Sequence, residues 1–226
     1  MEKNSSLAVL PPLTLPKRLF LIFLRIFFKL LYHQFAWTYD GVASVVSLGA
    51  WQKWVTSVLP FVDGPRTLEI GSGPGHLLIG LYQKGITAYG LDESPQMVKL
   101  AKKHVERLGL RPNLIRGDAH TLPFADASFH QIVMTFPAEY ILKAATISEI
   151  RRILIKGGVA LVLPVAWITG RKPWERVAAW VSRVTGEAPA WDESVLDPLK
   201  KVGFDVTWEM MNFTYSKIIL IRLFKS

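Results

Sequence analysis

The most informative stretch of the sequence is Leu68-Glu69-Ile70-Gly71-Ser72-Gly73-Pro74-Gly75-His76-Leu77. It reads as an apolar strand that runs into a Gly-x-Gly-x-Gly turn and then into a helix. Glycines allow the backbone of such a turn to approach a ligand closely, and open α/β sheets bind nucleotides at the carboxyl end of the first strand. The stretch therefore predicts a Rossmann-like α/β domain with a nucleotide-type ligand at this turn.

The spacing of the glycines indicates the class of ligand. A dinucleotide-binding turn reads Gly-x-Gly-x-x-Gly, and its third glycine would fall at His76, whereas this chain has it at Gly75. An acid, Glu69, stands two residues before the first glycine. A carboxylate there repels a pyrophosphate but suits the ammonium group of a methionine moiety. The turn therefore favours a cationic nucleoside over a dinucleotide.

Acidic residues also follow the next two predicted strands. The second strand ends at Asp92, about 20 residues after the glycines, where a carboxylate accepts hydrogen bonds from both hydroxyls of a ribose. Ser94 and Pro95 follow, as the cap and first residue of a helix. The third strand leads into Asp118, which is placed to bind an adenine amino group. Each acid alone could be a helix cap or a solvated loop residue. Because acids follow three successive strands, binding of a nucleoside is the favoured interpretation.

Short apolar runs alternate with amphipathic helices from Arg66 onward, which predicts a parallel sheet with helices on both faces. The expected strands cover 67–70, 87–91, 113–116, 131–135 and 159–165, and the expected helices cover 76–83, 95–108 and 144–156. A helical insertion at about 171–202, with helices at 173–184 and 192–201, precedes strands at 205–211 and 217–223. Because only 212–216 separates the last two strands, they should pair antiparallel.

Taken together, these motifs resemble those of the class I methyltransferases that use S-adenosylmethionine, in the group often called type 11, which modifies small molecules, lipids and quinones. The resemblance covers about Tyr39 to Val165 and specifies the cofactor better than the acceptor. The residues that carry it are Glu69 to Leu77, Gly90 to Met97, Gly117 to Ala119, Leu122-Pro123-Phe124, Asp126, Phe129, Ile150 to Leu154 and Gly157-Gly158. It implies a seven-stranded, mostly parallel sheet in the order 3-2-1-4-5-7-6. Lys156 departs from it, since the family usually has proline there.

The resemblance also implies S-adenosylmethionine as cofactor and S-adenosylhomocysteine as product. Carried over position by position, it assigns Glu69 and the three glycines to the methionine part, Asp92 to the ribose, and Asp118 with Ala119 to the adenine. The complete set of expected cofactor-binding residues is Glu69, Gly71, Ser72, Gly73, Gly75, His76, Asp92, Glu93, Met97, Asp118, Ala119 and Thr135. No metal is expected, because the five histidines have no metal-ligand spacing.

Catalysis of methyl transfer requires little from the protein, because the sulfonium already carries a good leaving group and the enzyme mainly aligns the reactants. A general base is needed only if the acceptor loses a proton. We expect Tyr39 and Tyr140 to line the reaction centre and Glu139 to serve as the base. The alternative interpretation makes them packing aromatics and a solvated carboxylate.

The first 60 residues are expected to form amphipathic and lid helices in front of the domain at 61–226. Arg18 to Tyr32 is nearly all apolar, but Arg25 and Lys29 interrupt it, so it is too short and too charged to span a bilayer. The segment at about 17–33 would suit the surface of an anionic membrane, and the alternative is a helix that covers the sheet or the site. Without cysteine or a clean secretory signal, we expect a cytoplasmic, peripherally membrane-associated protein.

The net charge of +9 attracts an anionic partner, either phospholipid or nucleic acid. The basic N-terminal segment, the many Trp and Phe residues and the insertion from Trp174 to Trp191 favour a lipophilic acceptor at a membrane surface, such as a phospholipid headgroup or an isoprenoid quinone. An RNA methyltransferase is the first alternative, which Thr135-Phe136-Pro137-Ala138 disfavours because base-modifying enzymes resemble Asp/Asn-Pro-Pro-aromatic there. The second is a non-catalytic, membrane-associated protein that binds the cofactor. The oligomeric state has no sequence signal.

Overall fold

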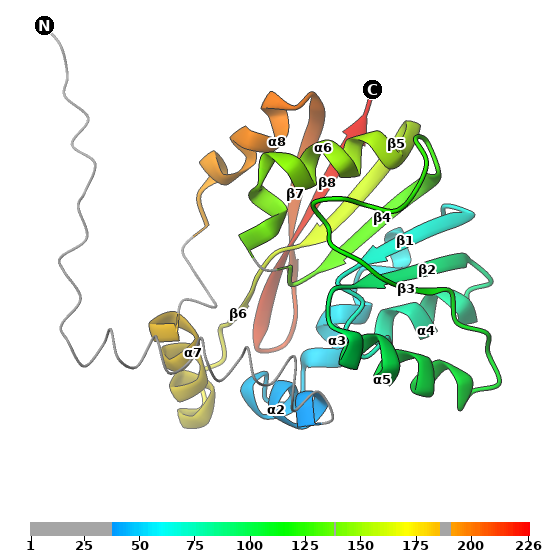
Figure 1. Ribbon diagram of the computed structural model, residues 1–226. Helices are drawn as coiled ribbons and strands as arrows, with labels where there is room; N and C mark the ends of the chain where they lie inside the picture. The colour runs from blue at the N-terminus through cyan, green and yellow to red at the C-terminus, as the bar shows by residue number, and fades with distance from the viewer. Residues whose placement is uncertain (1–37, 138, 186–190) are drawn as a thin grey trace, which may run out of the picture.

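The computed structural model describes residues 38–137, 139–185 and 191–226, so the segment expected to contact the membrane at about 17–33 lies outside them. Figure 1 shows one twisted sheet with helices on both faces. The strands are β1 (Arg66–Ile70), β2 (Thr87–Asp92), β3 (Leu114–Arg116), β4 (Phe129–Thr135), β5 (Leu154–Leu163), β6 (Ala166–Ile168), β7 (Phe204–Asn212) and β8 (Ser216–Lys225). The α-helices are α2 (Tyr39–Val46), α3 (Trp51–Thr56), α4 (His76–Gln83), α5 (Pro95–Glu106), α6 (Ala144–Ile153), α7 (Pro173–Thr185) and α8 (Asp197–Lys201). Short 3-10 helices are η2 (Leu59–Phe61), η3 (Glu139–Leu142) and η4 (Glu193–Leu196).

The strand order is β3-β2-β1-β4-β5-β8-β6, and β7 pairs with the other edge of β8. The predicted order is therefore confirmed, with β7 and β8 as the antiparallel pair. The prediction of seven strands was wrong by one, because β6 was not expected. Pro164 has no N–H to donate and interrupts β5, after which Ala166–Ile168 resumes pairing with β8.

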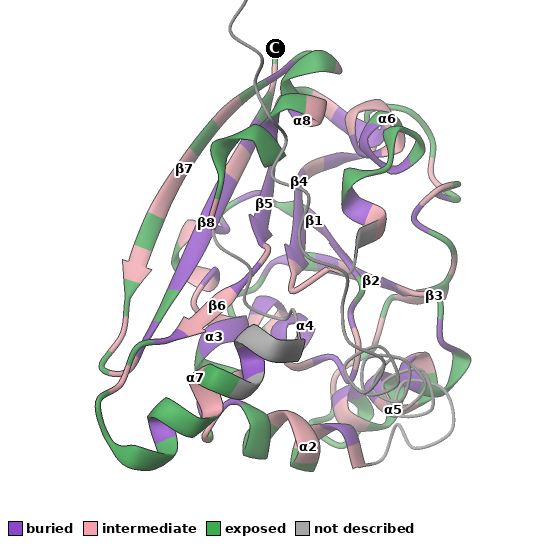
Figure 2. Ribbon diagram, turned by 90° about the vertical axis from the view of Figure 1, so that its left-hand side faces the viewer, coloured by how far each residue is buried: buried purple, intermediate pink, exposed green. Residues whose placement is uncertain are grey.

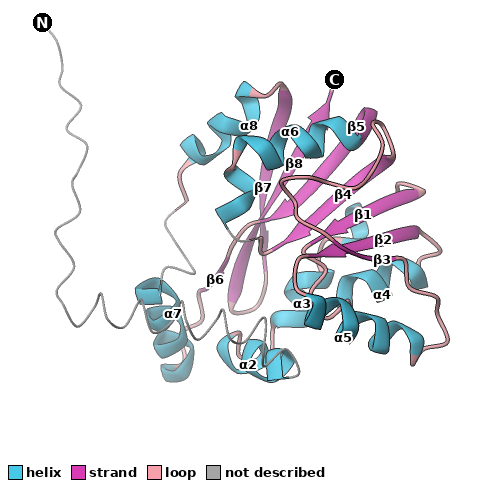
Figure 3. Ribbon diagram, in the orientation of Figure 1, coloured by secondary structure: helices cyan, strands magenta, loops and turns pink. Residues whose placement is uncertain are grey.

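The core has two layers, one on each face of the sheet, and Figure 3 shows the helices that cover the two faces. Successive residues of a strand point to opposite faces, and β4 shows the alternation clearly. Ile132 and Met134 join the cluster that α6 covers, whereas Val133 joins the cluster that α3 and α4 cover. Figure 2 shows the central strands buried along most of their length, as expected for a parallel sheet covered on both faces.

Two predicted boundaries were wrong. The helix expected at 144–156 ends at Ile153, because Leu154 is already extended and begins β5, five residues before the strand expected at 159–165. Within the region expected to form lid helices, the chain reverses after α2, where Leu48 and Gly49 have φ values of 54° and 80°. That reversal separates α2 from α3 and brings α2 to the carboxyl ends of the strands.

The site is positioned by the parallel part of the sheet. Strands β1, β2, β3 and β4 run in one direction, so their carboxyl ends meet at one edge. These ends are Ile70, Asp92, Arg116 and Thr135. A crevice outside this edge is where open α/β sheets bind their ligands.

Candidate active site

The glycine turn between β1 and α4 has an open side and a packed side. Gly71, Gly73 and Gly75 all have positive φ values, of 76°, 48° and 85°. A Cβ atom at Gly73 would meet nothing within 4 Å, whereas one at Gly75 would lie 3.0 Å from the Cβ atom of Ala101 on α5. Gly75 is therefore required for packing, and the backbone at Gly73 borders open space that a ligand can approach.

The carboxylate of Glu69 is buried at the end of β1 without a full set of partners. The residue is 2% exposed, and its Oε2 atom accepts no hydrogen bond. Burial raises the pKa of this carboxyl well above its usual value, and the nearby charge of Asp92 adds to the effect, while a hydrogen bond with the backbone of Leu78 opposes it. An unpaired buried acceptor beside the glycine turn fits a cationic group such as the ammonium of a methionine moiety.

Asp92 is oriented by two backbone donors. Its Oδ2 atom accepts from the N–H of Gly73 at 2.8 Å, and its Oδ1 atom accepts from the N–H of Ser94 at 2.9 Å. The predicted helix start is confirmed, since the Ser94 hydroxyl accepts from the N–H of Met97 and Pro95 is the first residue of α5. The carboxylate is thus held between the glycine turn and α5 in a fixed orientation.

Asp118 lies on an exposed loop after β3. Its Oδ1 atom accepts from the N–H of His120 at 2.8 Å and lies 2.5 Å from Nδ1 of the same residue. These contacts, the backbone hydrogen bond first, hold the pKa of the Asp118 carboxyl below its usual value. The next residue, Ala119, is buried in the core.

Arg152 on α6 supports the loop that follows Asp118. It pairs with Glu149 and Asp126 and donates to the carbonyl oxygens of Leu122 and Phe124, all at 2.7 to 3.0 Å. These carboxylates raise its pKa above the usual value, with Glu149 the larger cause. The loop is therefore tied to α6 by one guanidinium group.

An aromatic wall runs from α2 to the carboxyl end of β4. Tyr39 is 7% exposed and packs on the fully buried Met97, and its ring meets Trp51 edge to face at 6.0 Å. Trp51 in turn lies 4.9 Å from the ring of Phe136, which follows β4 with a φ of 51°. A positive φ is uncommon for a bulky residue and often marks a functional site. The sequence pointed to Tyr39, to Met97 and to the stretch after β4 that contains Phe136, but it gave no sign of Trp51.

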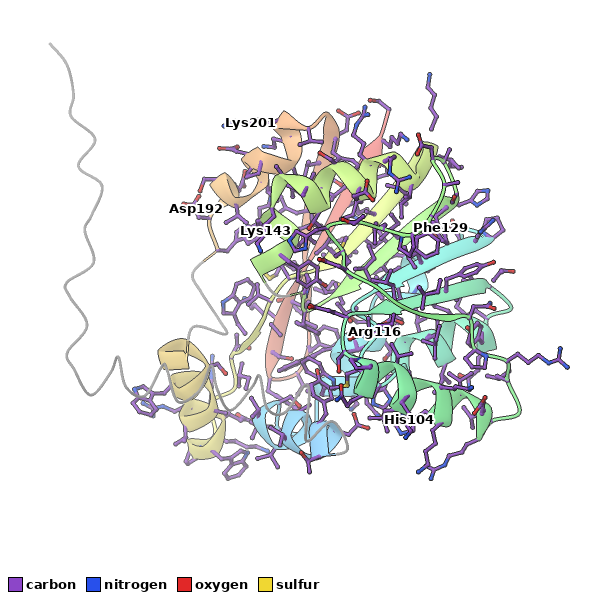
Figure 4. The ribbon with its side chains drawn as sticks, viewed as in Figure 1. His104, Arg116, Phe129, Lys143, Asp192 and Lys201 are labelled. Carbon is purple, nitrogen blue, oxygen red and sulfur yellow. The ribbon has the colours of Figure 1, made fainter. Side chains whose placement is uncertain are left out.

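A chain of polar contacts joins helix α2 to the glycine turn. Asp40 Oδ1 lies 2.7 Å from His76 Nε2, and this hydrogen bond is the main cause that lowers the pKa of Asp40. The ring of His76 stacks on that of His104 at 5.9 Å, and Nδ1 of His104 lies 3.0 Å from the carbonyl oxygen of Pro74. Figure 4 shows His104 on α5. His76, which was expected to lie near the ligand, thus links α2 to the glycine turn.

The remaining expected residues differ in how well they are placed. A Cβ atom at Gly71 would lie 3.0 Å from the Tyr140 hydroxyl oxygen, so Tyr140 lies directly over the turn. Thr135 is half-buried at the end of β4, and Glu93 is exposed beside Arg116, whose Nε donates to its carbonyl oxygen (Figure 4). Glu139 begins η3, but its side chain lies outside the described part of the structure.

Within 38–137, 139–185 and 191–226, none of the helices combines the length and the apolar character that crossing a bilayer requires.

The chain is similar to known methyltransferases. Residues 68–162 match a family model described as "Methyltransferase domain". A demethylmenaquinone methyltransferase of Thermotoga maritima is 25% identical over 217 residues, which are 84% of this chain and 93% of that protein. A phosphatidylethanolamine N-methyltransferase of Cereibacter sphaeroides is 34% identical over 103 residues, which are 44% of this chain and half of that protein. The solved structure of a SAM-dependent methyltransferase of Methanosarcina mazei has a TM-score of 0.57 at 18% identity and covers 75% of this chain and 96% of that chain.

Proposed function

This chain belongs to the class I methyltransferases that use S-adenosylmethionine, with the family's domain at residues 68–162, and from that premise we propose that it methylates a lipophilic acceptor. The observation that carries the proposal is the aromatic wall of Tyr39, Trp51 and Phe136 beside the glycine turn. Aromatic faces bind flat apolar rings and cationic amines. An isoprenoid quinone ring and a phospholipid headgroup amine are the two acceptors that this chemistry suits.

The cofactor would be held by groups that the fold presents along the crevice. The unpaired carboxylate of Glu69 suits its ammonium group, the oriented carboxylate of Asp92 suits its ribose, and the loop at Asp118 and Ala119 suits its adenine. The other residues assigned to the cofactor are Gly71, Ser72, Gly73, Gly75, His76, Glu93, Met97 and Thr135. When bound, the cofactor supplies an electrophilic methyl group on a sulfonium.

The protein's own part in the reaction is positioning and exclusion of water. Tyr140, with its hydroxyl over Gly71, and Tyr39, packed on Met97, line the reaction centre. Glu139 is the general base for an acceptor that must lose a proton. The polar link from Asp40 to His76 keeps α2 over the crevice and so shields the reacting groups from solvent.

The curated relatives support two acceptors. The Thermotoga maritima protein is named for a demethylated menaquinone and the Cereibacter sphaeroides protein for phosphatidylethanolamine. The first similarity extends over most of this chain, and the second is confined to less than half of it. A quinone ring is therefore the acceptor to test first, with the phospholipid amine as the second.

The test is incubation of the full chain with radiolabelled S-adenosylmethionine and, in parallel, a total lipid extract or total RNA. We expect label in the lipid fraction, which chromatography then assigns to a quinone or to a phospholipid. Label in RNA alone would favour the nucleic-acid alternative, and tight cofactor binding without labelled product would favour a non-catalytic protein. The Asp92→Ala variant, which loses a cofactor contact, is the negative control.

A further inference from the structure

Helix α7 turns a polar face inward. Glu175 is 7% exposed and Ser182 is 9% exposed, and Ala178 and Ala179 between them pack against the hydrophobic core. Residues three, four and seven apart share one face of a helix, so these four positions form the buried side. A helix on a soluble domain normally buries its large apolar residues and exposes its polar ones.

The outward face of α7 carries large apolar side chains instead. Trp174, Val177 and Trp180 stand three residues apart and are 57%, 60% and 60% exposed. Figure 2 shows the exposed surface of this helix at the end of the molecule. Single exposed apolar residues are common, but two tryptophans and a valine in one stripe indicate a surface that is covered in function.

The local contacts keep α7 in this orientation. Glu175 accepts a hydrogen bond from the N–H of Lys172 at 2.8 Å, and Pro173 occupies the first helical position. Gly170 leaves room for the Glu175 carboxylate, which any side chain at position 170 would displace. Rotating α7 so that Trp174 or Trp180 became buried would move Glu175 out of this site and break its hydrogen bond with Lys172. The cap therefore favours the orientation in which the tryptophans are exposed.

Cationic side chains lie at the start of the same helix. Arg171, Lys172 and Arg176 are exposed, and the Nζ atom of Lys172 lies 5.3 Å from the centre of the Trp174 ring. Tryptophan favours the boundary between hydrocarbon and water, and Lys and Arg attract anionic headgroups within about a Debye length. With a net charge of +9, the chain as a whole is complementary to an anionic surface.

Further apolar surface adjoins α7. Figures 1 and 2 both place α2 beside it, and α2 contributes Val45 and Val46, which are 76% and 43% exposed. The hydroxyl of Tyr215 donates to the carbonyl oxygen of Leu48 at 3.1 Å, so the loop after α2 is fixed to the turn between β7 and β8. Since α2 also carries Tyr39, which packs on Met97 of α5, this end of the molecule adjoins the proposed cofactor site.

A hollow of about 930 Å³ lies beside the exposed face of α7, between side chains of this helix and of strands β6, β7 and β8, and Val177 of that face lines it. Trp167, Trp180, Met210, Arg176 and Lys217 are among its lining residues. Trp191 also lines it, and its buried indole N–H has no hydrogen-bond partner. Aromatic, cationic and unpaired donor groups around one hollow suit the acyl and phosphate parts of an anionic lipid.

We infer that the outward face of α7 docks on an anionic phospholipid bilayer, with Trp174 and Trp180 at the hydrocarbon boundary and Arg171, Lys172 and Arg176 at the phosphates. Docking in this orientation brings α2 and the aromatic wall of the proposed site toward the membrane that carries the acceptor. The role given to this docking rests on the proposed function, but the binding of the protein to vesicles is measured independently of methyl transfer.

The test is co-sedimentation of the full chain with vesicles of phosphatidylcholine and phosphatidylglycerol. We expect the double variant Trp174→Ser/Trp180→Ser to partition about tenfold or more weakly than wild type. The matched control is Leu108→Ser, which removes another exposed apolar side chain, 55% exposed after α5, and should bind like wild type. Equal cofactor affinity of all three proteins shows that each is folded.

A second pair of variants tests whether the cationic side chains at the start of α7 contribute to vesicle binding. Arg171→Glu/Arg176→Glu should also bind the anionic vesicles about tenfold or more weakly. Lys99→Glu/Lys103→Glu makes the same change in net charge on the exposed face of α5 and should bind within about threefold of wild type. Equal losses in the two double variants would mean that only the overall charge matters, and would overturn the assignment to α7.

Three other results would overturn the inference. The first is wild type that does not sediment with anionic vesicles, and the second is a tryptophan variant that binds as tightly as the Leu108→Ser control. The third is a dimer of wild type that becomes a monomer in the tryptophan variant, which would assign the face to a second copy of this chain. Methyl transfer to a detergent-solubilised acceptor is measured alongside, because it tests the proposed function without a membrane.

Discussion

The substitution Glu69→Gln tests two consequences of burying this carboxylate, which are its attraction for a cationic ligand and its effect on how stability depends on pH. Glutamine has nearly the same shape and keeps an acceptor oxygen, but it carries no charge. Glu69 is 2% exposed and its Oε2 atom is unpaired, so water screens its interaction with a bound cation very little. We therefore expect the variant to fold and to bind S-adenosylmethionine much more weakly than wild type.

The magnitude follows from the cost of losing one charged hydrogen bond, about 1.5–3 kcal/mol. Since 1.4 kcal/mol is a factor of ten, the dissociation constant should rise about 10- to 150-fold. Isothermal calorimetry measures this directly. The matched control is Glu106→Gln, which neutralises an exposed acid on α5 whose side chain is 52% exposed, and should leave the affinity unchanged.

The same substitution changes how stability depends on pH. Because the pKa of Glu69 is raised in the native state, the folded protein keeps a proton that the unfolded chain has already released. The free energy of unfolding of wild type therefore falls as pH rises from the unfolded pKa through the native pKa, and Glu69→Gln removes this contribution. Thermal unfolding at about pH 5 and about pH 8 should show a melting temperature that declines more in wild type than in the variant.

Two results would refute this reasoning. One is a cofactor affinity for Glu69→Gln within twofold of wild type, which would mean that the carboxylate does not face the cationic part of the ligand. The other is an identical pH dependence of the two melting temperatures, which would mean that Glu69 is ionised in the folded protein at all of these pH values.

Three other substitutions test the rest of the site. Asp92→Ala should weaken cofactor binding by about 1–3 kcal/mol, because the ribose loses a charged acceptor, and an unchanged affinity by calorimetry would contradict the assignment. Asp40→Asn should lower the free energy of unfolding by about 0.5 kcal/mol or less, since the Asp40 side chain is 41% exposed. The difference between wild type and the variant should disappear as pH falls through the lowered native pKa of Asp40. A difference that persists in acid would exclude the contact with His76 as its source. Arg152→Ala should lower the melting temperature by about 2–4 °C and weaken cofactor binding, because the loop after Asp118 loses its hydrogen bonds to α6. An unchanged melting temperature and cofactor affinity would show that Arg152 does not hold this loop in place.

The parts of the fold that follow local rules were predictable from the sequence. The glycine turn, the Ser94 cap and the acid at the end of β2 are each determined by residues close together in the chain, and the structure has them as expected. Strand β6 escaped prediction because three residues after a proline have no periodicity to detect. Its pairing with the start of β8 is a tertiary contact.

The aromatic wall shows why the site was harder to predict. Tyr39 and Tyr140 stood out as aromatic residues near expected strand and helix ends, but Trp51 and Phe136 meet only because α3 folds back against the end of β4. The orientation of α7 was also hard to predict from the sequence. Its sequence has an amphipathic pattern, yet the contact of Glu175 with Lys172 decides that the polar side is buried.

The most direct test of the account is mass spectrometry of the lipids recovered after incubation of the purified full chain with S-adenosylmethionine and demethylmenaquinone or phosphatidylethanolamine. We expect one of these acceptors to gain the mass of one CH₂ unit with wild type, and much less product to form with Asp92→Ala at a cofactor concentration that half-saturates wild type. Cofactor consumed without a methylated lipid, or methylation that appears only in added RNA, would contradict it.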